Sequence, residues 1–178
     1  MLNGITLGII ITLVLLFFCI ILSILVTAII GPLSKTPNDV LDEIADLIDA
    51  KKKDTFLDLG SGDGRLVFKV YERYKCKCFG YDISPLLVIF SNLMKDIKFP
   101  FVKDIVFEIQ NIYKVDISKA NKIYCFLDEN SLRILRPRLE KFVKDGGVVY
   151  SYENSIKDMK EEKRVVLKNK KGLYIYSK

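Results

Sequence analysis

The feature that most constrains the fold of this chain is a glycine-rich turn that follows a short apolar run. Residues 55–65 read Thr-Phe-Leu-Asp-Leu-Gly-Ser-Gly-Asp-Gly-Arg, with glycine at every second position from Gly60 to Gly64. Glycine tolerates positive φ angles and, because it has no Cβ, lets a ligand approach the main chain closely. The pattern predicts a buried parallel strand that opens into a ligand-binding loop, although a tight strand-to-helix turn without a ligand has the same pattern.

The spacing of the glycines distinguishes this loop from two common nucleotide sites. A dinucleotide-binding loop has the pattern Gly-x-Gly-x-x-Gly and holds a pyrophosphate at the N-terminus of the next helix. Here the third glycine comes one residue early, and the acidic Asp58 precedes the loop. A carboxylate in this place repels a pyrophosphate but suits a ligand that carries an ammonium group. No Gly-Lys-Ser/Thr follows, which excludes a phosphate-binding P-loop.

The stretch from Asp58 to Gly64 resembles the first motif of the class I S-adenosylmethionine-dependent methyltransferases. The ligand of that family has an ammonium group, a ribose and an adenine but no phosphate, which agrees with the departures from the dinucleotide pattern. The resemblance implies an α/β fold with a Rossmann-like seven-stranded sheet. It also implies S-adenosyl-L-methionine as cofactor and methyl transfer as the reaction.

Two further polar residues follow predicted strands. Asp82 stands at the end of the strand predicted over 76–81, where an acid in nucleoside-binding βαβ units accepts hydrogen bonds from both ribose hydroxyls. After the strand predicted over 105–109, the family commonly has an aspartate that contacts the adenine amine. This chain has Asn111 instead, whose carbonyl oxygen can accept from the same amine. The cofactor-binding residues implied by the resemblance are Asp58, Gly60, Ser61, Gly62, Gly64, Asp82, Ile83, Asn111 and Ile112.

The rest of the chain continues the alternation of strands and helices. Strands are predicted over 122–127 and 148–152, and residues 164–167 and 173–176 flank a polar turn and read as a terminal hairpin. Five parallel strands followed by a hairpin give the sheet of the class I fold.

Three helices carry proline signals. Ser84 and Pro85 are expected to start the helix whose apolar residues run from Leu86 to Met94. Thr36 and Pro37 are the expected N-cap and first residue of the first soluble helix. Pro137 falls within a later helical pattern, over 132–143, and is expected to kink that helix or split it in two.

The N-terminal segment is predicted to cross a membrane. Residues 1–34 contain no charged side chain, and residues 5–30 are almost wholly apolar, which exceeds the ~20 residues needed to span a bilayer. A cleaved signal peptide is disfavoured because no basic residue precedes the apolar core. The positive flank, Lys35 and the three lysines at 51–53, lies after the segment and predicts a single-pass protein whose following domain faces the cytoplasm. The predicted division is an anchor over 1–34 and a methyltransferase domain over 35–178, close to the bilayer.

Charge and cysteine usage narrow the possible partners. The chain has a net charge of +6, all of it after residue 34, and it contains no histidine and four cysteines. A basic domain beside a membrane is attracted to anionic headgroups, so membrane lipid is ranked above nucleic acid as a partner. Cys76 and Cys78 lack the two-residue spacing of a metal knuckle, and without histidine no complementary ligand pair exists, so no metal site is predicted.

The acceptor side is expected at the carboxyl end of the fourth strand, where open α/β sheets bind ligands. The candidates there are Leu127, Asp128 and Glu129, although a helix cap and a first-turn acid explain the two acids equally well. The sequence lacks the Asn/Asp-Pro-Pro-aromatic signature expected where a base amine is methylated, so a nucleic-acid acceptor is disfavoured. No catalytic base is assigned.

The order of segments carries a narrower resemblance. An apolar N-terminal segment, Thr36-Pro37, a short helix and the loop from Asp58 to Arg65 together are similar to the small membrane-associated protein-lysine methyltransferases that act on the ATP synthase c-subunit and the adenine nucleotide translocase, and to their prokaryotic relatives. This resemblance implies N-methylation of a lysine in a protein. The alternatives are a methyltransferase for a lipid, quinone or other small amphiphile at the membrane surface, and a non-catalytic module that binds S-adenosylmethionine.

Overall fold

The computed structural model describes residues 3–30 and 35–178, with the backbone alone for residues 5 and 23–30. The chain divides into two compact units, Met1–Leu33 and Ser34–Lys178, and the first contains one helix, α1 (Gly4–Ile30). Over the residues whose side chains are also described, no helix is long and apolar enough to cross a membrane. The predicted end of the anchor at Ser34 lies outside the described residues.

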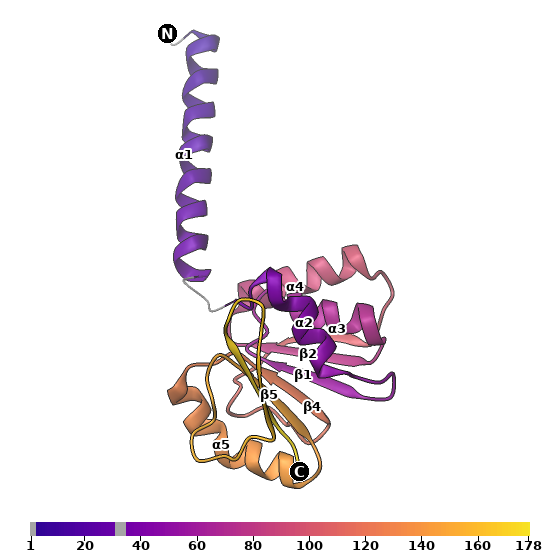
Figure 1. The fold of residues 1–178 in the computed structure, drawn as a ribbon. Coiled ribbons are helices and arrows are strands. Elements are labelled where there is room, and N and C mark those ends of the chain that lie inside the picture. The colour runs from indigo at the N-terminus through magenta and orange to yellow at the C-terminus, as the bar shows by residue number, and fades with distance from the viewer. Residues whose placement is uncertain (1–2, 31–34) are drawn as a thin grey trace. The chain divides into compact units, whose positions relative to one another are not determined.

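The second unit is an α/β domain in which helices and strands alternate (Figure 1). Its elements in chain order are α2 (Asn38–Ile48), β1 (Thr55–Leu59), α3 (Arg65–Tyr74), β2 (Lys77–Asp82), α4 (Pro85–Lys98), β3 (Ile105–Ile109), β4 (Lys122–Cys125), α5 (Glu129–Lys144), β5 (Val148–Tyr152), β6 (Lys163–Val166) and β7 (Gly172–Tyr176).

The strands form one seven-stranded sheet in the order β3-β2-β1-β4-β5-β7-β6. Strands β1 to β5 pair in parallel, and β7 is antiparallel to both β5 and β6. The predicted sheet of five parallel strands and a hairpin is therefore confirmed. The chain builds outward from β1 to β3 and then places β4 on the other side of β1, so the carboxyl ends of β1 and β4 adjoin at a topological switch point.

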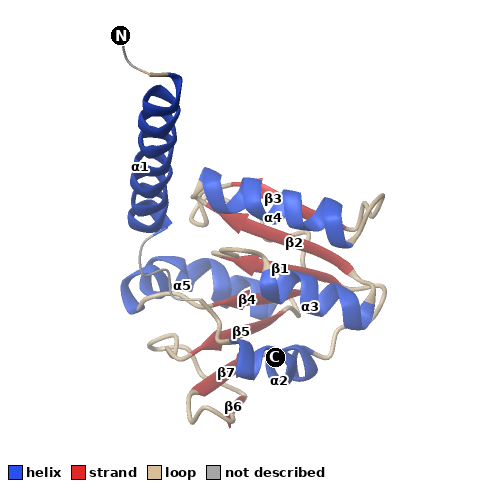
Figure 2. Cartoon of the chain, turned by 90° about the horizontal axis from the view of Figure 1, so that it is seen from above, coloured by secondary structure: helices blue, strands red, loops and turns tan. Residues whose placement is uncertain are grey.

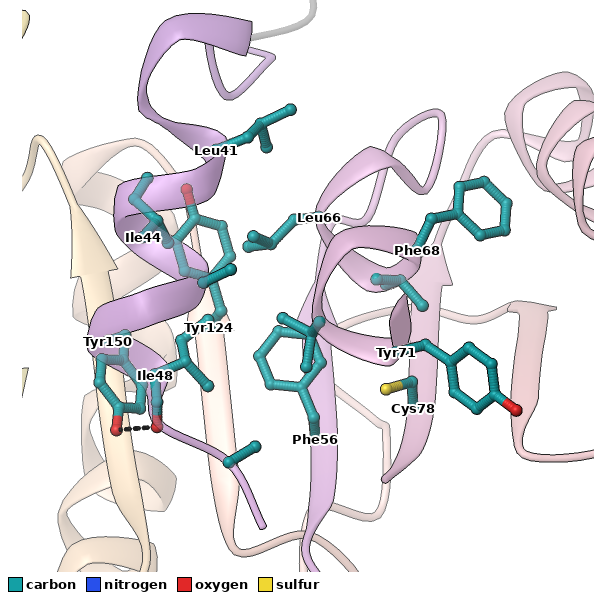
Figure 3. Packing of buried hydrophobic residues seen from close by; sticks show 14 of the residues in the cluster. Leu41, Ile44, Ile48, Phe56, Leu66, Phe68, Tyr71, Cys78, Tyr124 and Tyr150 are labelled. Atoms are coloured by element: carbon teal, nitrogen blue, oxygen red, sulfur yellow. Dashed lines mark hydrogen bonds between the residues drawn. The ribbon is translucent and has the colours of Figure 1, made fainter. Parts of the chain in front are cut away.

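Apolar side chains of the strands alternate between two cores, one on each face of the sheet. Phe56 of β1 packs in the core formed with α2, α3 and α4, whereas its neighbour Leu57 packs in the core formed with α5. Figure 2 shows the strands side by side with the helices along them. In the first core the Tyr150 hydroxyl donates to the Ile48 carbonyl at 3.0 Å (Figure 3), which fixes the end of α2 to β5.

The prediction for the start of the first soluble helix was wrong by one position. Helix α2 begins at Asn38, Pro37 occupies the cap position, and no side chain caps the helix. The Thr36 hydroxyl is buried and forms a 2.8 Å hydrogen bond with the Tyr124 hydroxyl of β4. A buried hydroxyl must find a partner, and Tyr124 supplies one that a local cap prediction does not consider.

Pro137 does not split helix α5, which continues from Glu129 to Lys144. A proline inside a helix leaves the carbonyl four residues earlier, here that of Arg133, without its backbone donor. Arg133 and Pro137 are both exposed, so water can serve that carbonyl. The apolar side of α5, which includes Leu132 and Leu139, stays buried through the proline.

Candidate active site

The glycine loop follows β1 and is hydrogen-bonded to the end of β2. The backbone amides of Gly60 and Ser61 both donate to the Tyr81 carbonyl, at 2.8 and 3.0 Å. Gly60, Gly62 and Gly64 have φ angles of +84°, +56° and +75°. These left-handed conformations strain residues that carry a side chain, which is the local reason for the glycine spacing.

Two of the glycines face different surroundings. A Cβ on Gly64 would stand 2.6 Å from Cζ of Phe107, so the loop packs against β3 without room for a methyl group. A Cβ on Gly62 would meet no atom within 4 Å. The main chain at Gly62 is therefore open to a ligand, as the sequence pattern predicts.

Asp82 positions the loop through its carboxylate. Its Oδ2 accepts from the Gly62 amide at 2.9 Å, and its Oδ1 accepts from the Ser84 amide at 2.8 Å. The side chain is buried, and each carboxylate oxygen retains one further acceptor position. Asp82 can therefore hold the loop and still accept from a pair of ligand hydroxyls.

Asp58 lies at the base of the loop and is 3% exposed. Burial, followed by the negative charges of Asp82 and Asp63, raises the pKa of Asp58 well above its usual range. A cationic group of a ligand beside this carboxylate would offset those effects and favour the charged form. The arrangement suits an ammonium group, as predicted from the sequence.

Ser61 places another polar atom in the loop. Its Oγ is buried and has no hydrogen-bond partner within the described part of the chain. The same atom would lie 2.8 Å from a Cβ on Gly80, so a side chain at position 80 of the neighbouring strand would collide with it. Buried hydroxyl groups are ordinarily satisfied, and a bound ligand is one way to satisfy this one.

A clamp between Asp63 and Arg65, which the sequence patterns did not indicate, closes the far side of the loop. Arg65 donates to Asp63 through Nε at 2.8 Å and Nη2 at 2.6 Å, and its Nη1 reaches the Thr36 carbonyl and the Asn38 side chain. Burial by itself raises the pKa of Asp63, but the bonds and charge of Arg65 outweigh it and lower that pKa. Because Asp63 is neutralised within the protein, Asp58 is left as the loop acid that a cation can pair with.

The residues after β2 and β3 come together beside the loop. The Gln110 amide donates to the Asp82 carbonyl at 3.0 Å, which brings Asn111 and Ile112 towards the end of β2. Asn111 Oδ1 already accepts from the Tyr113 amide at 2.9 Å, so one acceptor position and the amide nitrogen remain for a ligand. Ile83 is 70% exposed next to Asp82, and it presents an apolar surface on which a flat ring can lie.

The loop after β4 supplies the predicted acceptor side. Leu127 Cδ2 lies 3.3 Å from the position of a Cβ on Gly60, so this side chain packs directly on the glycine loop. The Asp128 carboxylate caps α5, accepting from the Ser131 amide at 3.0 Å and the Ser131 hydroxyl at 2.7 Å. The Asn154 side chain donates to the Leu127 carbonyl at 2.9 Å and holds this loop in place from the end of β5.

Glu129 lines a polar cavity of 470 Å³ at the start of α5. The other lining residues are Asn130, Arg133, Ser155 and Lys157. Every one of these side chains is polar or charged. The cavity therefore offers a carboxylate, two cationic groups and two neutral polar groups to a ligand, together with the carbon atoms of their side chains.

The comparisons with known proteins agree with this geometry. The model of the ANTKMT methyltransferase domain family matches residues 58–163, more than half of the chain. The chain belongs to this family. It is a class I methyltransferase that uses S-adenosylmethionine, and the buried Asp58, the open main chain at Gly62 and the acceptors of Asp82 fit the ammonium and ribose groups of that cofactor.

Two curated relatives of this ANTKMT-family chain are lysine methyltransferases by name. A protein-lysine N-methyltransferase of Saccharolobus islandicus is 30% identical over 71% of this chain and 78% of its own length. A lysine N-methyltransferase of Caenorhabditis elegans, named for the ATP synthase c-subunit, is 32% identical over 52% of this chain, which spans only 47% of that protein.

A solved structure of another methyltransferase supports the class I fold of this chain. An RNA methyltransferase from Salinibacter ruber in complex with S-adenosyl-L-homocysteine has a TM-score of 0.74 and 26% identity, covering 80% of this chain and 92% of that one. The predictions of a class I methyltransferase sheet and of S-adenosyl-L-methionine as cofactor are thereby confirmed.

Proposed function

We propose that this methyltransferase transfers a methyl group to the side-chain amine of a lysine in a protein. The observation that carries the proposal is the polar cavity that Glu129 lines beside the carboxyl end of β4. Lysine acceptors in the names of both curated relatives add support. A lipid or quinone would need an apolar surface in this place, so a small amphiphile is disfavoured.

The side chains suggest how an amine acceptor is held. The Glu129 carboxylate can pair with the lysine ammonium group, while the positive charges of Arg133 and Lys157 in the same cavity favour the neutral amine. A lysine must lose a proton, here to solvent water, before its nitrogen can attack. The cofactor supplies a methyl group on a positively charged sulfur. A C–N bond forms as the C–S bond breaks, the electron pair stays on sulfur in S-adenosylhomocysteine, and the protein chiefly aligns donor and acceptor.

Asp128 is a poorer candidate than Glu129 for contact with the amine. Hydrogen bonds from the Ser131 side chain and amide lower the pKa of Asp128 and hold its carboxylate against the first turn of α5. A carboxylate of low pKa is a weak base. In this proposal Asp128 holds the start of α5, and Glu129, one residue later, faces the acceptor.

We further propose that residues 1–34 anchor the enzyme in a membrane by a single pass, with the methyltransferase domain facing the cytoplasm. The absence of charge before Lys35, the apolar run over 5–30 and the lysines at 51–53 support this location. S-adenosylmethionine is available on that side. A membrane-bound or membrane-adjacent protein is then the acceptor within reach.

The acceptor class can be tested with the full-length enzyme, isolated membranes and S-adenosylmethionine labelled in the methyl group. We expect the label in protein, with methyl-lysine identified by mass spectrometry, and little in extracted lipid or RNA. Glu129→Gln should lower transfer at least tenfold while leaving cofactor affinity unchanged. Glu72→Gln, on α3 away from the cavity, is the matched control. Label recovered mainly in lipid or RNA would refute the proposal.

A further inference from the structure

Helix α4 presents an apolar stripe to solvent. The stripe consists of residues at helical spacing that are 40% to 65% exposed: Leu86, Ile89, Phe90, Leu93 and Ile97. The opposite side of α4 is buried against the sheet. A helix that is apolar on all sides is ordinarily covered on all sides. The described part of the domain covers only one side of this helix.

Phe101 extends this α4 stripe beyond the end of the helix. It lies in the connection between α4 and β3, is 99% exposed, and has a φ angle of +69°. A left-handed conformation is unfavourable for a residue with a side chain. A bulky aromatic side chain is thus held fully in solvent at an unfavourable backbone angle, which indicates a surface that meets something apolar.

The net charge of the whole domain suits an anionic surface, whereas the charges beside the α4 stripe are nearly balanced. Lys95 Nζ lies 3.8 Å from Asp96, Lys98 Nζ lies 5.5 Å from the centre of the Phe68 ring, and Lys103 is followed by Asp104. The charged residues all follow residue 34, so the domain has the whole net charge of +6. Lysine can lay its hydrocarbon stem along an apolar surface while its ammonium group reaches lipid headgroups.

The α4 stripe also adjoins the place where the folded domain begins. Asn38, the first residue of α2, lines a cavity of 320 Å³ together with Phe90, Met94 and Lys98 of α4. The start of the folded domain and the α4 stripe therefore share one face.

We propose that the α4 stripe and Phe101 insert into the interfacial region of an anionic bilayer and thereby orient the methyltransferase domain. A second copy of this chain fits the stripe less well, because a symmetric contact would bring the same lysines of two molecules together. The inference rests on the proposed membrane location and is independent of the acceptor, so methyl transfer and insertion are measured separately.

Tryptophan fluorescence can test the insertion, because the natural chain contains no tryptophan. The full-length variants Phe101→Trp and Ile134→Trp each carry one reporter. Ile134 is 50% exposed but lies on α5, whose core is on the other face of the sheet, so it is the matched control. Both variants are placed in vesicles of phosphatidylcholine and phosphatidylglycerol, with or without brominated acyl chains. Flotation verifies that each variant is bound, and cofactor affinity verifies its fold.

We expect blue-shifted emission and several-fold stronger quenching by brominated lipid for Phe101→Trp than for Ile134→Trp. Equal, weak quenching of the two floated variants would overturn the proposal. Shielding of the reporter at position 101 without lipid quenching, together with cross-linked dimers, would show that a second copy covers the stripe and would also overturn it. Leu93→Asp should weaken the quenching at position 101 without changing cofactor affinity.

Discussion

The Asp58 carboxylate lowers the stability of the cofactor-free protein but favours the binding of a cationic ligand. Its carboxylate is buried beside two other acids in the protein without cofactor, and these surroundings raise its pKa. Such a group favours the folded state most below its unfolded pKa, and the contribution is lost as the pH rises through the folded pKa. The residue lowers stability at neutral pH in order to pair with a cation.

Asp58→Asn should therefore bind S-adenosylmethionine about ten- to a hundredfold more weakly, since hydrogen bonds and pairing with charged groups contribute about 1.5–3 kcal/mol. Without cofactor, the same variant should melt at a higher temperature than the parent protein. This advantage in melting temperature should grow as the pH rises from acid towards neutral. Calorimetry and thermal denaturation across pH measure the two effects. Unchanged affinity, or an advantage greatest in acid, would contradict this role.

Gly62 and Gly64 provide a matched pair of substitutions. Gly64→Ala should destabilise the fold by about 2–4 kcal/mol, because its methyl group would collide with Phe107 in addition to the left-handed strain. Gly62→Ala should cost only about 1 kcal/mol but should weaken cofactor binding, because its methyl group points into open space at the ligand. Urea denaturation and calorimetry together distinguish them. Equal effects of both variants on stability would show that strain alone governs the loop.

For single residues, the sequence predicted backbone conformation better than side-chain contacts between residues far apart in the chain. The glycine spacing and Asp82 could be recognised because both depend on local backbone geometry and on position relative to a strand. The hydrogen bond from Arg65 to Asn38 joins residues 27 positions apart, and the one between Thr36 and Tyr124 joins residues 88 positions apart. No local pattern contains such pairs. The carboxylate that caps α5 was left open between two roles, and the geometry assigns Asp128 to the cap.

Among the elements, α5 depends on its first turn. Asp128→Ala should reduce stability by about 0.5–2 kcal/mol, the usual cost of losing an N-cap, and Asp128→Asn should cost less because it keeps an acceptor oxygen. The Ser131 bonds lower the pKa of Asp128, so the contribution of the cap is present above the unfolded pKa and is lost as the pH falls through the folded pKa. Urea denaturation at neutral and acidic pH measures this. A difference between Ala variant and parent that persists in acid would argue against the charged cap.

For helix α4, the sequence predicted the helix but not which of its sides faces the sheet. Its apolar residues indicated a helix correctly, but eight of its fourteen residues are Ile, Leu, Val, Phe or Met, so the pattern does not determine which positions face the sheet. The structure buries Leu87 and Val88 and exposes Leu93 and Ile97. The make-up of the sheet, five parallel strands and a hairpin, was easier to predict, because the class I resemblance extends from the glycine loop to the terminal hairpin.

For the whole molecule, both cores are made of residues from Val40 to Tyr176. The fragment 35–178 should therefore fold and bind S-adenosylmethionine with the affinity of the full chain. Its transfer to membrane-bound acceptors should fall at least tenfold, because the loss of the anchor removes the high local concentration at the membrane. Calorimetry and labelled methyl transfer measure the two properties. A folded fragment that fails to bind would show that residues 1–34 complete the cofactor site.

The open sheet leaves one edge strand at each end, β3 and β6. Unpaired amides and carbonyls on an edge strand can template pairing with another chain, which begins aggregation. Strand β6 carries Lys163 and Arg164, both exposed, and β3 carries the exposed Glu108. Pairing of another strand with β6 would bring that chain against these two charged side chains, which opposes the contact. The charged edges thus protect the protein from polymerising through its sheet, even where molecules are concentrated.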